Sequence, residues 1–150
     1  MVTDEINHAM SKLAIRPSDF RLLSENESEA LYQELLEHFV EGGDRRWWWE
    51  SFSKPSESVT FPDNKGFERI IELVPDPAER VWFVVEENQM LFYPIYEATP
   101  ETIQNVIGEC YGFEYYIIPK NRDWLLCENH HSRVIGLGEI INRKLAKYAT

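Results

Sequence analysis

A chain of 150 residues, of which 43% are hydrophobic and 13% aromatic, is long enough to bury one core and too aromatic to be intrinsically disordered. Its formal net charge of −11 argues against general binding to nucleic acids or anionic membranes, because both need clusters of Lys and Arg. No segment approaches the roughly 18 continuous apolar residues of a membrane span. The two cysteines form no disulfide framework, so we expect a cytoplasmic protein with free thiols.

The first half of the sequence is predicted to be mainly helical. A capping box at Ser24–Glu27 marks the start of a helix, and Gly42-Gly43 marks its end. Asp44 is expected to cap a short helix that follows. In chain order, the predicted elements are helices over residues 1–14 and 24–41, a short helix near 44–52, a brief strand at 58–61 and a helix over 62–74.

The second half is dominated by strand patterns. Residues 80–87 and 90–97 are rich in β-branched and aromatic side chains and flank Asn88-Gln89, which predicts a hairpin. Pro94 has no N–H, so its strand is expected at an edge of the sheet or with a bulge. The remaining predicted elements are a helix that begins at Pro100, an antiparallel meander over 113–119, 123–129 and 133–138, and a helix over 139–148.

Runs of adjacent strands, rather than strict alternation with helices, favour the α+β class. We therefore predict a single domain over residues 1–150 with a mostly antiparallel sheet of about five strands. N-terminal helices, one helix inserted between strands and a C-terminal helix complete it. Within this domain, a helical part over 1–52 is expected to pack on a sheet-rich part over 57–150.

The stretch "CENHH" (127–131) gathers residue types that occur in catalytic and metal sites. A cysteine–histidine nucleophile is disfavoured, because residues i and i+4 of an extended chain lie about 13 Å apart and a thiol must lie within about 3.2 Å of its base. The cysteine is therefore expected to be buried and inert. Metal binding by Glu128, His130 and His131 remains an alternative, although adjacent histidines normally point apart. If Glu128 is buried, Arg133 across the hairpin is its nearest candidate partner.

Three consecutive tryptophans, Trp47, Trp48 and Trp49, cannot all point into one core, so at least one is expected to be partly exposed. Arg45 and Arg46 beside them have side chains able to stack on an aromatic ring or to bind an anion. Two interpretations remain open. The tryptophans form either an aromatic wedge that seals the N-terminal helices onto the sheet, or a binding surface for a partner or small ligand.

The predicted helix over 24–41 is acidic. From Ser24 to Asp44 the chain carries seven Asp and Glu residues and no Lys or Arg. Like charges one helical turn apart reduce stability, so a basic partner is one explanation for the run, and an ordinary solvated face is the other. Glu34, Glu37 and Glu41, together with the stretch 45–49, are the candidate binding residues.

Motifs typical of enzymes are absent from the sequence. No phosphate-binding Gly loop, G-x-S-x-G, H-E-x-x-H or C-x-x-C occurs, so we expect no cofactor and favour a protein that is not an enzyme. The stretches "RRWWWESF" and "EYYIIPKNRDWLLCENHHSRVIGLG" resemble a family of small bacterial proteins of unknown function. The general character of the chain is similar to that of toxin-immunity proteins of the SMI1/KNR4 type.

These observations lead to three hypotheses about function. The first is a non-enzymatic protein-binding module, such as an immunity-type inhibitor of a basic bacterial toxin. The second is a metal-dependent hydrolase or metal-binding protein centred on Glu128 and His130. The third is a protein that binds a small ligand at Trp47–Trp49. The sequence indicates no oligomeric state.

Overall fold

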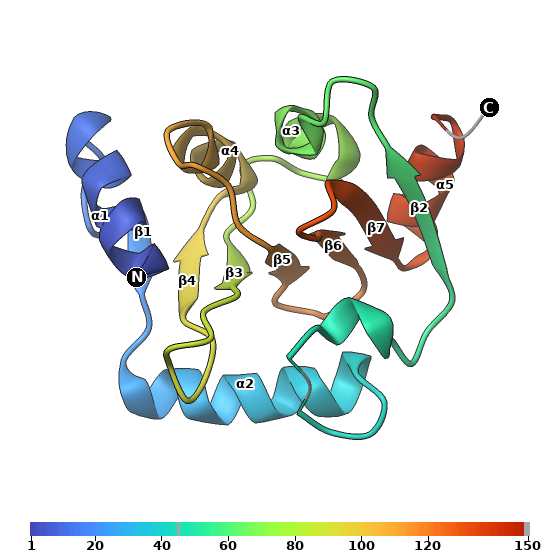
Figure 1. The fold of residues 1–150 in the computed structure, drawn as a ribbon, viewed down its shortest axis with the longest axis horizontal. Helices are drawn as coiled ribbons and strands as arrows, with labels where there is room; N and C mark the ends of the chain where they lie inside the picture. Colours follow the sequence, from blue (N-terminus) through green and yellow to red (C-terminus); the bar gives the residue numbers. More distant parts are fainter. Residues whose placement is uncertain (45, 149–150) are drawn as a thin grey trace.

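The computed structural model describes residues 1–44 and 46–148, and it forms three layers (Figure 1). A sheet lies in the middle, with one long helix across one face and four helices along the other. The first face is covered by α2 (Glu25–Phe39), and the second by α1 (Val2–Lys12), α3 (Ile70–Leu73), α4 (Pro100–Gly108) and α5 (Glu139–Ala146). The predicted single α+β domain is confirmed.

The sheet contains seven strands in the described part of the chain, rather than the predicted five or so. Their spatial order is β1-β4-β3-β5-β6-β7-β2, and all neighbouring pairs are antiparallel. They comprise β1 (Phe20–Leu22), β2 (Ser56–Thr60), β3 (Val81–Val85), β4 (Ile95–Ala98), β5 (Tyr115–Pro119), β6 (Leu125–Glu128) and β7 (Arg133–Leu137). The sequence does not reveal β1 because three residues are too few to show an alternating pattern.

Two further predictions need correction. The β3–β4 hairpin exists, but Val84 pairs with Ile95, so the connection is far longer than the predicted Asn88-Gln89 turn. Pro94 precedes β4 because it has no N–H for the ladder. The helix predicted over 62–74 is reduced to a turn of 3-10 helix, η2 (Gly66–Arg69), followed by α3; the positive φ of Asn64 interrupts a helix there.

Both faces of the central strands are buried. In β5, Tyr115 and Ile117 pack in the core shared with α1, α3, α4 and α5. Tyr116 and Ile118 point the other way, into the core shared with α2 and with the 3-10 turn η1 (Trp48–Glu50). Burial on both sides explains why the strands read as nearly continuous apolar runs.

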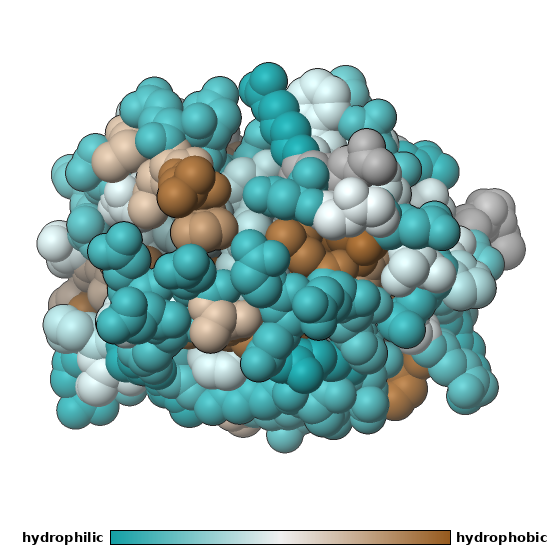
Figure 2. All heavy atoms as spheres, turned by 90° about the horizontal axis from the view of Figure 1, so that it is seen from below, coloured by the Kyte–Doolittle hydropathy of each residue, from teal (hydrophilic) through white to brown (hydrophobic). Residues whose placement is uncertain are grey.

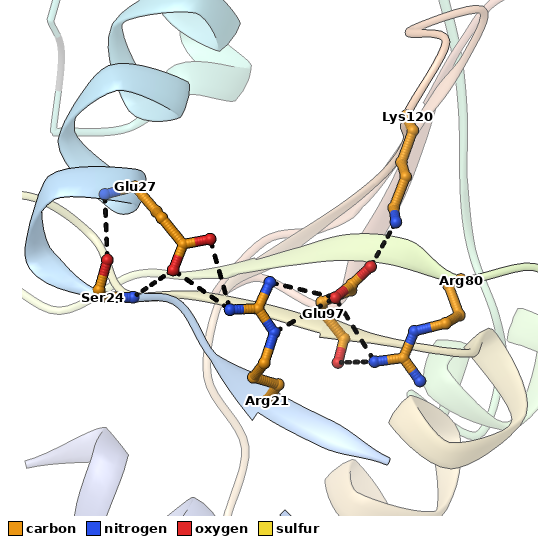
Figure 3. Close-up of polar contacts among 6 residues, drawn as sticks. All are labelled: Arg21, Ser24, Glu27, Arg80, Glu97 and Lys120. Carbon is orange, nitrogen blue, oxygen red and sulfur yellow. Dashed lines mark hydrogen bonds and ion pairs between the residues drawn. The ribbon is translucent and has the colours of Figure 1, made fainter. Parts of the chain in front are cut away.

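A nearly buried carboxylate, Glu97 on β4, joins three cationic side chains (Figure 3). Arg21 of β1 approaches it to 3.2 Å and Arg80 to 3.5 Å, and Lys120 completes the group. Burial raises the pKa of Glu97, but the hydrogen bonds from Lys120, Arg80 and Arg21 outweigh it and lower the pKa to about 2. This group fixes the short edge strand β1 to the sheet.

Arg21 also fixes the start of α2. Its guanidinium lies 3.2 Å from Glu27, whose carboxylate accepts from the backbone N–H of Ser24. The Ser24 hydroxyl accepts in turn from the backbone N–H of Glu27, so the predicted capping box is confirmed. The acidic helix is therefore held at a defined place on the sheet.

Replacement of Glu97 by Gln is expected to lower the free energy of unfolding at neutral pH by on the order of 3 kcal/mol. The depressed pKa of Glu97 means that its stabilisation is present above the ordinary value of 4.5 and is lost as pH falls toward about 2. Urea unfolding over this pH range should show the two proteins converging at the acid end. Glu57→Gln, on exposed β2, should show no such convergence, and a constant deficit for Glu97→Gln would contradict this account.

Gly136→Ala should destabilise the protein by about 1–3 kcal/mol, the usual cost of overpacking a core. A Cβ at Gly136 in β7 would lie 2.4 Å from Cγ2 of Ile141 and 2.7 Å from Cδ1 of Leu145, both on α5. Gly108→Ala is the matched control, because its Cβ would meet nothing closer than Cε2 of Phe67 at 3.6 Å. Thermal unfolding of both variants checks the prediction, which fails if they behave alike.

Candidate functional site

The tight turn between β6 and β7 places the two histidines at one end of the sheet. The side-chain oxygen of Asn129 accepts from the backbone N–H groups of His131 and Arg133, each at 3.0 Å. The backbone N–H of Asn129 donates to the carbonyl of Arg133 at 3.0 Å, which closes the turn. Because Tyr115 pairs with Glu128, the residue before β5, Glu114, lies beside this turn.

Glu114 is the centre of a buried hydrogen-bond network. Its side chain is 0% exposed, and one carboxylate oxygen accepts from Nε1 of Trp49 at 2.8 Å. The same oxygen lies 3.1 Å from Nδ1 of His130 and 3.3 Å from its backbone nitrogen, and the other oxygen accepts from the Tyr116 hydroxyl at 2.8 Å. A carboxylate that is ionised only accepts, so Nδ1 of His130 is the donor to it, and Nε2 is the acceptor when the ring is neutral.

The three tryptophans divide between core and surface. Trp48 is fully buried under the sheet, whereas Trp47 and Trp49 are half-buried, as the sequence predicts for at least one of them. The rings of Trp47 and Trp49 lie 5.0 Å and 5.9 Å from that of His130. The ring centres of His130 and His131 are 4.1 Å apart, so the expectation that they point apart is wrong, because both pack against Trp49.

The segment before the tryptophans differs from its prediction. Asp44 does not cap a helix; it accepts a hydrogen bond of 2.7 Å from the Tyr32 hydroxyl, and η1 has no side-chain cap. Arg45 lies outside the described residues. The guanidinium carbon of Arg46 lies 5.1 Å from the ring centre of Trp47, and its Nε lies 3.7 Å from a carboxylate oxygen of Glu86. Both Arg46 and Trp47 line a hollow of about 270 Å³.

A second carboxylate, Glu128, lies in the wall of a cavity of about 390 Å³ between η2, the end of α4 and the β6–β7 turn. The residue is 9% exposed and accepts a 2.9 Å hydrogen bond from the Tyr115 hydroxyl. Burial raises the pKa of Glu128, and this effect exceeds that of the hydrogen bonds from Tyr115 and the Gly66 backbone, which lower it. The expected pairing with Arg133 is wrong, because that guanidinium bonds to Ser58 and Thr60 on β2.

The surroundings of Cys127, Glu128 and His130 bear on the predictions about a cysteine nucleophile and a metal site. Cys127 is completely buried in the core facing α2, and burial raises the pKa of its thiol, as expected for an inert cysteine. Among residues 1–44 and 46–148, no group of three or more His, Cys, Asp or Glu side chains is arranged to hold a metal ion. Glu128 and His130 instead bond to Tyr115 and Glu114.

The acidic helix presents exposed carboxylates to solvent. Glu34 pairs with Arg122, whereas Glu37 and Glu41 have no ion-pair partner in the part of the chain that the structure describes. Figure 2 shows this face as mostly hydrophilic, with separate hydrophobic patches, one of them near the end at which α2 begins. Leu22 and Leu91 line a hollow of about 310 Å³ there, and Leu91 is 85% exposed.

Comparison with known proteins identifies one family, described as a family of unknown function (DUF6756), whose model matches residues 1–149. The chain belongs to this family. No curated protein matches it, and no solved structure does. None of the helices in the described residues combines the length and apolar character needed to cross a membrane.

Sequence reasoning found the tryptophans and the two histidines of this site but missed Glu114. A Glu between Phe113 and Tyr115 has no spacing that marks it as buried. The three residues that donate to Glu114 meet only when β5, the β6–β7 turn and η1 pack together. The sequence signal for Glu114 is a single carboxylate with apolar residues on both sides.

Tyr116→Phe should destabilise the protein by about 1.5–3 kcal/mol, because it removes a hydrogen bond to the buried charge of Glu114. Tyr96→Phe is the matched control. Its hydroxyl is equally buried but has no hydrogen-bond partner among the described residues, so its removal should be neutral or stabilising. Chemical denaturation measures both changes, and equal losses would rule out a special contribution from the Glu114 network.

Proposed function

We propose that this protein is a non-enzymatic binding module that recognises a basic protein partner through the face of α2. The observation that carries the proposal is the row of exposed carboxylates on this helix beside an exposed apolar patch. Glu29 and Glu37 are exposed on the helix, and Glu41 is exposed in the turn just after its end at Phe39. A negative row of this kind attracts a basic surface and raises its rate of association.

The apolar patch beside these carboxylates offers a surface for hydrophobic contact. Leu22, Met90 and Leu91 are exposed at the start of α2, next to Glu25. Apolar side chains that are bordered by charges are typical of protein interfaces, where the apolar centre contributes affinity and the charged rim contributes specificity. A partner with Lys or Arg around an apolar anchor would complement both parts.

The biological role that we propose for this binding is inhibition of a basic toxin, as in an immunity protein. The acidic charge and the resemblance in general character support that role. The two free cysteines are consistent with binding in the cytoplasm, which is part of the same proposal.

The combined replacement Glu29→Gln, Glu37→Gln and Glu41→Gln should weaken binding to the partner by about tenfold, as expected for three surface charge interactions. The partner is isolated from host cells at low salt with the tagged wild-type protein. Calorimetry with the purified pair then gives the affinity and its dependence on salt, which the replacement should reduce.

The matched control is the combined replacement Glu57→Gln, Glu68→Gln and Glu101→Gln, which removes the same charge from exposed positions on other elements. Its affinity should stay at the wild-type value. Leu91→Ser should weaken binding without a change in salt dependence. The proposal fails if no partner is recovered at low or high salt, or if both triple variants bind equally.

A further inference from the structure

We infer that the cavity beside Glu128 binds the primary ammonium group of a small amine whose body is apolar or aromatic. The cavity lies on the side of the sheet away from α2, so it is separate from the protein-binding face proposed above. Three features of its wall lead to this ligand: an uncompensated carboxylate, a second fixed acceptor and several aromatic rings.

The carboxylate is Glu128. Among residues 1–44 and 46–148, its one side-chain partner is the neutral hydroxyl of Tyr115, and no cation pairs with it. The raised pKa follows from burial without a countercharge, in contrast to Glu97, which three cations surround. A buried carboxylate that borders a cavity is therefore a place where a cation of the ligand would be stabilised.

His130 also lines this cavity, and an imidazole in its neutral form has one acceptor nitrogen. Nδ1 of His130 lies 3.1 Å from Glu114, so in a ring protonated only at Nδ1 the acceptor is Nε2. A carboxylate and an imidazole nitrogen are two acceptors, and a primary ammonium group has three N–H donors. This set of acceptors favours an ammonium group over a neutral alcohol or an anion.

The aromatic rings explain the apolar body of the ligand. Phe67, Tyr111, Phe113 and Tyr115 line the cavity, and Tyr111 is 100% exposed, so its ring is available to a ligand. Aromatic faces attract cations and cover apolar groups. A volume of about 390 Å³ is within the usual range for small-molecule sites.

The test uses 2-phenylethylamine as the probe and 2-phenylethanol as its neutral analogue, with calorimetry for affinity and backbone NMR for location. The amine should bind at millimolar concentration or below and shift the amide signals of residues 64–67, 110–115 and 128–132. Glu128→Gln should weaken it about tenfold or more, the loss expected for a charge-assisted hydrogen bond. The alcohol should bind equally weakly to both proteins.

Two further variants complete the design. Glu57→Gln removes one charge at a distance and should leave the affinity unchanged. Tyr111→Ala changes a fully exposed side chain, so it should fold normally and weaken the amine about threefold. It also keeps the inference testable if Glu128→Gln does not fold. No binding by the wild-type protein, shifts elsewhere, equal affinity for the alcohol, or full affinity in Glu128→Gln or Tyr111→Ala would each overturn the inference.

Discussion

A carboxylate without exposed surface needs hydrogen-bond donors from the protein itself. Glu114 has such donors from three separate segments. Trp49 comes from the turn after α2, Tyr116 from β5 and His130 from the turn between β6 and β7. An ionised carboxylate that lost these donors inside the protein would be severely destabilised, so the network requires all three segments to be in place together. The position of His130, and with it the shape of the neighbouring cavity, depends on this requirement.

The covered sheet separates two surfaces of different chemistry. The outer surface that carries α2 is acidic and mostly hydrophilic, with small apolar patches, and it suits contact with a macromolecule. The opposite side contains a partly open cavity with a carboxylate and aromatic rings, and it suits a small molecule. The Glu114 network lies at the end of the sheet between them, where Trp49 packs with the α2 core and His130 lines the cavity. The two proposed surfaces are thus structurally distinct.

Local patterns in the sequence predicted most of the fold. The capping box of Ser24 and Glu27, the start of α4 at Pro100 and the meander of β5 to β7 depend on neighbouring residues, and they were predicted correctly. Strand β1 and the long β3–β4 connection depend on distant contacts, and they were not. The same division holds for the site. The tryptophans and histidines are conspicuous residue types, whereas Glu114 and the partner of Glu128 are defined only by what folds around them.

The two outer strands of the sheet affect how a partner can approach. Strand β1 has three residues and carries Arg21, and β2 carries Glu57 near a preceding Pro55. Short strands with charged side chains discourage the backbone pairing by which sheets extend or aggregate. An incoming peptide would therefore gain little by lying alongside either rim as an eighth strand. Binding of any partner would therefore depend on side chains, and its specificity would be sensitive to single substitutions on the surface.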